Sequence, residues 1–137
     1  MHSRTVYNSN QNGWSIKKYK IFASAEGRIR AAIVVTNNRV DTILIKRLSD
    51  EDTVVLEVII DSKKIILVSM YFDKSQRIET ELLKIEAIIQ HAKGAEELIA
   101  MDSNSRSTSW HDTLTNTRGR ILEEFLMSKQ LYIMNEE

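Results

Sequence analysis

The sequence predicts an α/β protein with helices packed on a mixed β-sheet. Three observations support this prediction. Short runs rich in β-branched residues, separated by turn residues, fill residues 20–72. Apolar residues then recur every three or four positions over residues 78–92, which is typical of an amphipathic helix. Downstream, short apolar runs flank a second helical pattern, so strands and helices alternate.

Length and charge indicate one domain with an ordinary core. The 137 residues include 19 basic and 19 acidic side chains, and 42% of the chain is hydrophobic. Cysteine is absent, which excludes disulfides, thiolate metal sites and cysteine nucleophiles. No apolar run reaches the roughly 18 residues of a membrane-spanning helix, and the N-terminus has no secretory pattern. We therefore expect an intracellular protein without membrane contact, with the nucleus as one candidate compartment.

The first half of the chain predicts strands after a polar start. Residues 1–19 are expected to form a polar N-terminal segment, of which 1–13 is typical of a loop, and the domain is expected to occupy residues 20–137. The predicted strands are 20–23, 31–36, 41–48, 53–60 and 64–72. The last two are joined by a short polar turn and are apolar almost throughout, which predicts a hairpin covered on both faces.

The second half predicts two helices and two more strands. Asp73 and Gln76 have the form of a capping box before the first helix, and Gly94 is expected to end it. A strand at 97–101 then leads into a polar loop. The second helix is indicated by the apolar positions Ile121, Leu122, Phe125 and Leu126, and the run 131–134 is typical of a last strand.

Asp102 and Asn104 directly follow the predicted strand at 97–101. Functional residues of open α/β sheets collect in loops at the carboxyl ends of strands. A spacing of two on an extended segment places both side chains on the same side of the chain. Mg²⁺ suits such a pair because it takes oxygen ligands and asks for only one or two carboxylates. Asp and Asn side chains also cap turns, so the spacing alone leaves a purely structural role open.

The residues around this pair carry a longer pattern. Residues 100–107 read A-M-D-S-N-S-R-S, Trp110 follows, and T-R-G at 117–119 opens the second helix. This resembles the endonuclease/exonuclease/phosphatase superfamily, most closely the apurinic-like endonuclease domain of non-LTR (LINE-type) retrotransposons, which commonly reads G-D-F-N-A-R-S, then Trp, then Thr with an R-G pair. The segments 30–35 and 68–72 are similar to two strands of that family, so the resemblance covers residues 20–135.

The resemblance implies a partial four-layer α/β sandwich of DNase I type that hydrolyses phosphodiester bonds in DNA with Mg²⁺ or Mn²⁺. Asp102 would orient or deprotonate the attacking water, and Asn104 would hydrogen-bond that water or the phosphate. Tyr71 would approach the phosphate through its hydroxyl. Three arginines would contact the DNA backbone, namely Arg106, Arg118 and Arg120. The family also implies a parent polypeptide that carries a reverse transcriptase.

The sequence departs from the family at both ends of the domain. The family has a Q-E-P motif whose Glu binds the metal and an S-D-H motif whose His stabilises developing charge, and neither motif occurs here. We therefore assign no metal-binding residue and expect a central fragment with weak or no activity alone. Two alternatives stay open: a phosphatase or exonuclease of the same superfamily, and a non-catalytic domain that binds nucleic acid or protein.

Four further features carry simpler expectations. Trp110 is expected to pack in the core, His111 to lie at the surface, and Gly119 to mark a close approach of helix and strand. Basic side chains outnumber acidic ones between residues 17 and 30, which predicts either a phosphate-binding patch or a solvated edge.

Overall fold

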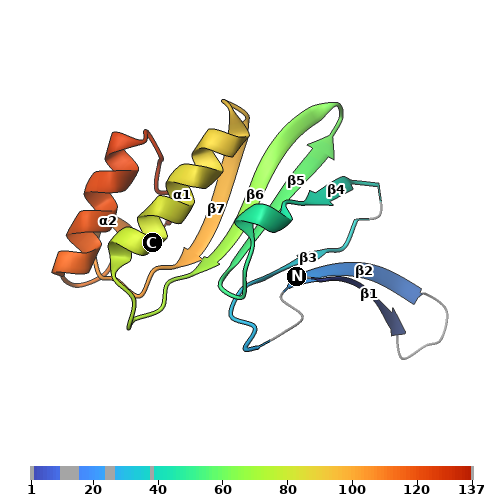
Figure 1. The fold of residues 1–137 in the computed structure, drawn as a ribbon, viewed down its shortest axis with the longest axis horizontal. Helices are drawn as coiled ribbons and strands as arrows, with labels where there is room; N and C mark the ends of the chain where they lie inside the picture. Colours follow the sequence, from blue (N-terminus) through green and yellow to red (C-terminus); the bar gives the residue numbers. More distant parts are fainter. Residues whose placement is uncertain (1, 10–15, 24–26, 38, 137) are drawn as a thin grey trace.

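The computed structural model describes residues 2–9, 16–23, 27–37 and 39–136 (Figure 1). In chain order the elements are β1 (His2–Ser9), β2 (Ile16–Ala23), β3 (Ala32–Val35), β4 (Asp41–Leu44), the 3₁₀ turn η1 (Lys46–Leu48), β5 (Thr53–Ile60), β6 (Lys63–Tyr71), α1 (Ile78–Ala92), β7 (Glu96–Asp102), the 3₁₀ turn η2 (Thr108–Trp110) and α2 (Thr117–Ser128). Neither described helix is long and apolar enough to cross a membrane.

The strands form two sheets, and the helices cover one of them. Strands β4, β5, β6 and β7 lie in that order in a mixed sheet, since β6 and β7 are parallel and the other neighbours are antiparallel. Helices α1 and α2 lie side by side over one face of this sheet, and the antiparallel sheet β1-β2-β3 lies on its other side (Figure 1). The predicted α/β architecture, with a mixed sheet and helices on its outer face, is confirmed.

The helix-covered face of the mixed sheet carries the larger core. Alternate residues of β6, namely Ile66, Val68 and Met70, point toward the helices and are buried. Helix α1 contributes Ile85 and Ile88, which are fully buried. The helix therefore forms where the sequence places an apolar stripe at helical spacing, and that stripe seals the sheet.

The opposite face of the mixed sheet packs against the antiparallel sheet. Leu56 and Val58 of β5 lie in one cluster with Phe22 of β2 and Ala31. Residues 53–56 are buried on both faces of β5, as predicted, whereas Ile59 and Ile60 at the far end of the strand are exposed. Burial on both faces of the strand is thus confirmed for residues 53–56 and not for the end of the strand at Ile59 and Ile60.

Two loop and strand predictions are wrong. Residues 2–9 form strand β1 and pair with β2 along its whole length, while residues 1 and 10–13 lie outside the described residues. The strand pairs with β2 through its backbone. Its polar sequence has no alternation of apolar and polar residues from which a strand could have been predicted. The predicted last strand at 131–134 does not form in the described chain. There, Gln130 adopts a positive φ of 58° and the Leu131 amide bonds back to the Leu126 carbonyl oxygen, which turns the chain onto the helix end.

Three details also differ from expectation, the first being that strand β2 begins at Ile16 and not at residue 20. The strand predicted over 41–48 ends at Leu44, and residues 46–48 form η1 instead. Asp73 does not cap α1: its carboxylate accepts bonds from the backbone N and hydroxyl of Ser75, and the helix N-cap is Arg77. The Asp side chain bonds a closer backbone donor two residues on, as in an Asx-turn.

Candidate functional site

Strands β6 and β7 end side by side and bring two predicted site residues together. Tyr71 pairs with Asp102 in the parallel register, and the Phe72 amide donates to the Asp102 carbonyl oxygen at 2.9 Å. The preceding pair, Met70 and Met101, packs into the helix-side core. Because side chains alternate along strands, Tyr71 and Asp102 both lie on the opposite face of the sheet.

Asn104 is attached to the same edge. Its side-chain amide donates to the Phe72 carbonyl oxygen at 2.6 Å, and its backbone N donates to the Asp102 carboxylate at 3.2 Å. Its φ of 46° lies in the left-handed region, which Asn tolerates better than most residues. The Asx-turn, which the sequence left open as a structural role, is present. It also holds Asn104 and the exposed Asp102 in place beside Tyr71.

The loop after Asn104 is braced against the start of α2. The Asn116 side chain accepts from the Gly119 amide at 2.8 Å and from the Arg106 amide at 3.1 Å. A Cβ on Gly119 would lie 1.8 Å from the Arg106 carbonyl oxygen, so the predicted close approach is confirmed, although its partner is the loop and not a strand. Trp110 packs partly buried against the helix-side core and His111 is exposed, both as expected.

The three arginines predicted to meet DNA have different surroundings. Arg106 forms a two-pronged ion pair with Asp112 at 2.8 and 2.9 Å, which lowers the pKa of Asp112 to about 2. Arg118 donates to backbone carbonyl oxygens of Gln76 and Asp73 at 2.8 and 3.1 Å. The side chain of Arg120 is exposed and makes no hydrogen bond or ion pair with the described part of the chain. Contacts of all three with DNA stay predictions.

Arg30, expected in a basic patch, lies instead among carboxylates behind Tyr71. Its guanidinium donates to both oxygens of Asp52 and to one oxygen of Asp73, and its Cζ lies 5.1 Å from the centroid of the Tyr71 ring. The pKa of Asp73 is lowered to about 2, first by the bonds from Ser75 and then by Arg30. In the sequence, the only indication that Arg30 belongs near the site was its position at the start of segment 30–35, which resembles a strand of the family.

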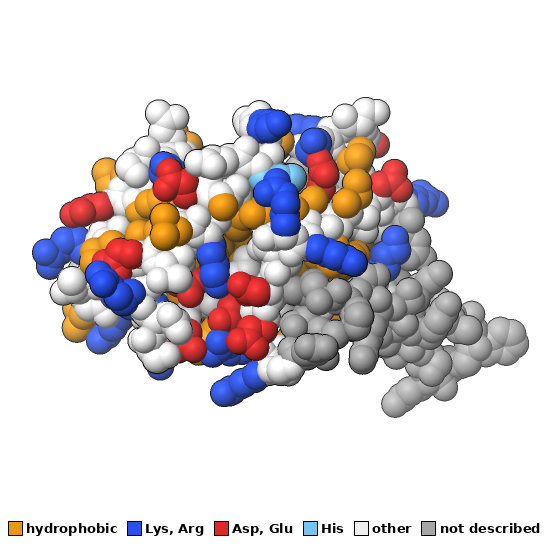
Figure 2. All heavy atoms as spheres, viewed as in Figure 1, with side chains coloured by type: hydrophobic (Ala, Val, Ile, Leu, Met, Phe, Trp, Pro, Cys, Tyr) orange, Lys and Arg blue, Asp and Glu red, His pale blue; other side chains and the backbone are white. Residues whose placement is uncertain are grey.

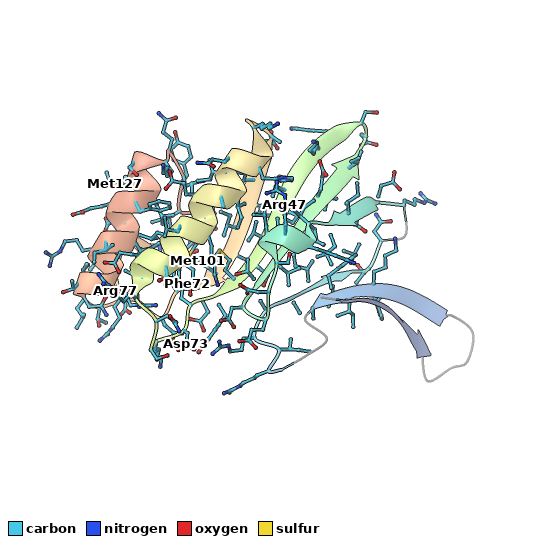
Figure 3. All side chains as sticks on the ribbon, in the orientation of Figure 1. Arg47, Phe72, Asp73, Arg77, Met101 and Met127 are labelled. Carbon is cyan, nitrogen blue, oxygen red and sulfur yellow. The ribbon has the colours of Figure 1, made fainter. Side chains whose placement is uncertain are left out.

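The patch predicted between residues 17 and 30 is therefore not confirmed as a free cationic surface, since Arg30 is neutralised by its partners. The side chains of Lys17 and Lys18 lie outside the described residues. Figure 3 shows Phe72, Asp73 and Met101 close together at the ends of β6 and β7, next to the start of α1.

A polar hollow of about 520 Å³ adjoins this network. Its lining includes Arg30, Asp52, Glu81 and Lys84, and acidic side chains gather in this part of the surface in Figure 2. Glu81 is 2% exposed, and burial raises the pKa of its carboxyl above the usual value. The hollow thus holds a buried carboxylate next to the ion pairs of Arg30.

The donor chemistry at the strand edge suits a hard cation. The Asp102 carboxylate is exposed, and the amide oxygen of Asn104 has no hydrogen bond to any described residue while its nitrogen bonds Phe72. Mg²⁺ binds oxygen donors and takes its remaining ligands from water and substrate phosphates. Within the described ranges no group of three or more His, Cys, Asp or Glu side chains is arranged to hold a metal ion. The residues fit a cation that binds jointly with a phosphate.

Comparison with known proteins indicates the family and the fold of the chain. The family model described as endonuclease-reverse transcriptase matches residues 65–137. The solved structure of the endonuclease domain of TRAS1, a telomere-specific non-LTR retrotransposon, is 25% identical in sequence, with a TM-score of 0.75. The similarity covers 98% of this chain and 56% of that one, so the chain spans about half the length of the solved domain. No curated protein sequence matches the chain.

Proposed function

This chain belongs to the endonuclease-reverse transcriptase family, and from that premise we propose that the shared edge of β6 and β7 hydrolyses phosphodiester bonds in DNA. The family and the DNase I-like fold are those of endonuclease domains of non-LTR retrotransposons. The observation that supports this site most directly is the register of Tyr71 beside Asp102, with the Asn104 side chain bonded to Phe72, the residue after Tyr71.

Each side chain has a chemical role in this proposal. The exposed Asp102 carboxylate accepts a proton from the attacking water, whose oxygen forms a bond to phosphorus as the ester P–O bond breaks. The leaving oxygen departs with the electron pair of that bond and takes a proton from solvent water. The free amide oxygen of Asn104 orients that water. The Tyr71 hydroxyl donates to a phosphate oxygen, and Arg120, whose side chain is exposed, contacts the DNA backbone.

A divalent cation, Mg²⁺ or Mn²⁺, belongs to the same proposal. The sequence alone assigned no metal ligand, but at this strand edge the oxygens of Asp102 and Asn104 would hold the cation, and when bound it would supply positive charge beside the phosphoryl oxygens. We expect weak activity from the 137 residues alone, because the sequence has no counterpart of the family's Q-E-P and S-D-H motifs. Loss of one preorganised donor typically lowers rates about 10²- to 10³-fold.

The proposed partner is duplex DNA, with a reverse transcriptase on the same polypeptide as the family description suggests. That substrate would place the activity inside the cell, where DNA is found, with the nucleus as the proposed compartment. The division into a polar segment over 1–19 and a partial endonuclease domain over 20–137 also stays a proposal, although β2 runs across residue 19.

Nicking of supercoiled plasmid tests the proposal. The wild type, Asp102→Ala and Asp41→Ala are compared in Mg²⁺ and in EDTA; Asp41 is an exposed aspartate on β4, remote in the sheet from β7. We expect slow nicking that needs Mg²⁺, falls at least about 100-fold in Asp102→Ala, and is unchanged in Asp41→Ala. Equal nicking by Asp102→Ala would contradict the assigned site. Duplex binding without nicking by a folded wild type would favour the non-catalytic alternative.

A further inference from the structure

The Arg30 guanidinium has a fixed orientation beside the candidate site. Its Nε and Nη2 donate to the two oxygens of Asp52, and its Nη1 donates to Asp73 at 2.7 Å, so every nitrogen of the group has a carboxylate partner. The side chains of Arg30 and Asp52 are 21% and 11% exposed. A planar fork held on two sides cannot rotate freely, and its Cζ lies over the Tyr71 ring, 5.1 Å from the ring centroid.

Asp52 bonds both members of the Arg30–Tyr71 contact. Its carboxylate orients Arg30, and its carbonyl oxygen accepts a 2.8 Å bond from the Tyr71 amide. The backbone amides of Arg30 and Ala31 both bond to the Glu51 carbonyl oxygen, at 3.2 and 3.3 Å. The cation and the ring it covers are therefore anchored to the same two-residue turn, which sets the distance between them.

The network continues to the loop that carries Asp102 and Asn104. Asp73 accepts Arg30 through its carboxylate and Arg118 through its carbonyl oxygen, the latter at 3.1 Å. Arg118 also reaches the Ser103 carbonyl oxygen at 3.5 Å. One chain of hydrogen bonds thus links the Arg30 guanidinium with the turn that carries Asp102 and Asn104.

From this geometry we infer that Arg30 is a positioning residue that holds the Tyr71 ring so that its hydroxyl meets the DNA phosphate. Arg30 does not itself bind DNA, because its charge is compensated by Asp52, Asp73 and Glu51. Lysine cannot replace it, since a single ammonium group cannot make the fork to Asp52 and reach Asp73 together. The inference rests on the proposed function, which supplies the phosphate contact of Tyr71.

A double-mutant cycle separates positioning from general stability. Wild type, R30K, Y71F and R30K/Y71F are compared by anisotropy of a labelled DNA duplex in EDTA, and R28K serves as a matched control because Arg28 is exposed two residues away. We expect R30K and Y71F each to weaken duplex affinity about tenfold, as for loss of one charge-assisted hydrogen bond. The double variant is expected to lose no more than either single one, and R28K to match the wild type.

Urea unfolding of the same proteins provides the readout for stability. R30K is expected to lower stability by the same amount whether or not Y71F is also present, so only the DNA affinities are non-additive. If R30K does not fold, D73N replaces it, since it removes one partner of Arg30 and leaves the pair with Asp52.

The remaining results would each overturn the inference. Affinities that multiply across the cycle, or an R30K affinity equal to that of the wild type, would show that Arg30 does not act through Tyr71 and would leave the proposed function standing. A folded wild type that binds no duplex would overturn the proposed function, and this inference with it.

Discussion

The two faces of the mixed sheet differ in how they are covered, and the candidate site uses both. Among the described residues, twelve buried side chains form the helix-side cluster, whereas five form the cluster on the opposite face. Tyr71 and Asp102 point to the face with the smaller described cluster, while their neighbours Met70 and Met101 are packed under the helices. A rigid backing on one side thus supports polar groups that stay open to solvent on the other.

The largest expected effect comes from the helix-covered side. Gly119→Ala would place a methyl group 1.8 Å from the Arg106 carbonyl oxygen, so α2 or the site loop must shift. We expect a loss of about 3 kcal/mol in the free energy of unfolding, typical of strong overpacking, measured by urea denaturation. Arg120→Ala, an exposed change one residue on, is the control and should cost under about 0.5 kcal/mol. An equal, small loss in both variants would show that this junction yields easily.

Two adjacent valines test the difference between the faces directly. Val55 points to the helices and Val54 to the other sheet, and both are 0% exposed on the same strand. Val55→Ala removes two methyl groups and leaves a cavity in a large cluster, so we expect a loss of about 2 kcal/mol. Val54→Ala should cost about 1 kcal/mol, because the described cluster around it is smaller and we expect it to collapse more easily onto the space. Equal losses by urea denaturation would mean that both faces pack equally tightly.

The sequence predicted the helix-covered region well and the other region poorly, for physical reasons. The stripe through Ile78, Leu82 and Ile85 matches the period of a helix, and α1 spans the predicted residues 78–92. Strand β5 also has its predicted bounds, because burial on both faces leaves an apolar run between turns. By contrast, β1 is held by backbone pairing with β2, and such pairing leaves no apolar pattern in the sequence.

The site shows the same division. Strand ends predicted that Asp102 and Asn104 lie at one edge, and the family-like motif drew attention to Tyr71, which the parallel register places beside them. The ion pairs of Arg30 with Asp52 and Asp73 span 22 and 43 residues of sequence. Charges that distant can be paired only by the fold, so composition alone made Arg30 part of a basic patch.

A smaller effect is expected from Glu81, which lies buried on α1 at the border between the two regions. Burial raises its pKa in the folded chain, so folding favours the neutral acid. Stability is therefore lost as the pH rises from the usual pKa of Glu through the raised folded pKa, and Glu81→Gln should stabilise the protein at pH 7 by about 1 kcal/mol. The gain should disappear below the usual pKa of Glu, where both states are protonated. Urea denaturation at pH 4 and 7 measures this difference, and Glu124→Gln, a change at an exposed position, is the control. A loss of stability in Glu81→Gln at pH 7 would show that the ion pair of Glu81 with Lys84 outweighs the cost of burial.

The smallest effect concerns the aspartates that hold Arg30 and Arg106. The pKa of Asp73 and that of Asp112 are each lowered to about 2, so folding favours both ionised forms. Their contribution is fully present above the ordinary pKa near 4 and is lost as the pH falls from about 4 to about 2. Asp73→Asn should flatten the pH dependence of urea denaturation in that window by less than about one proton. Asp112→Asn should flatten it similarly, but only Asp73→Asn should also weaken duplex binding, because Asp112 braces its own loop while Asp73 connects Arg30 with Arg118. Equal DNA affinity of the two variants would show that the contacts of Asp73 do not contribute to DNA binding at the candidate site.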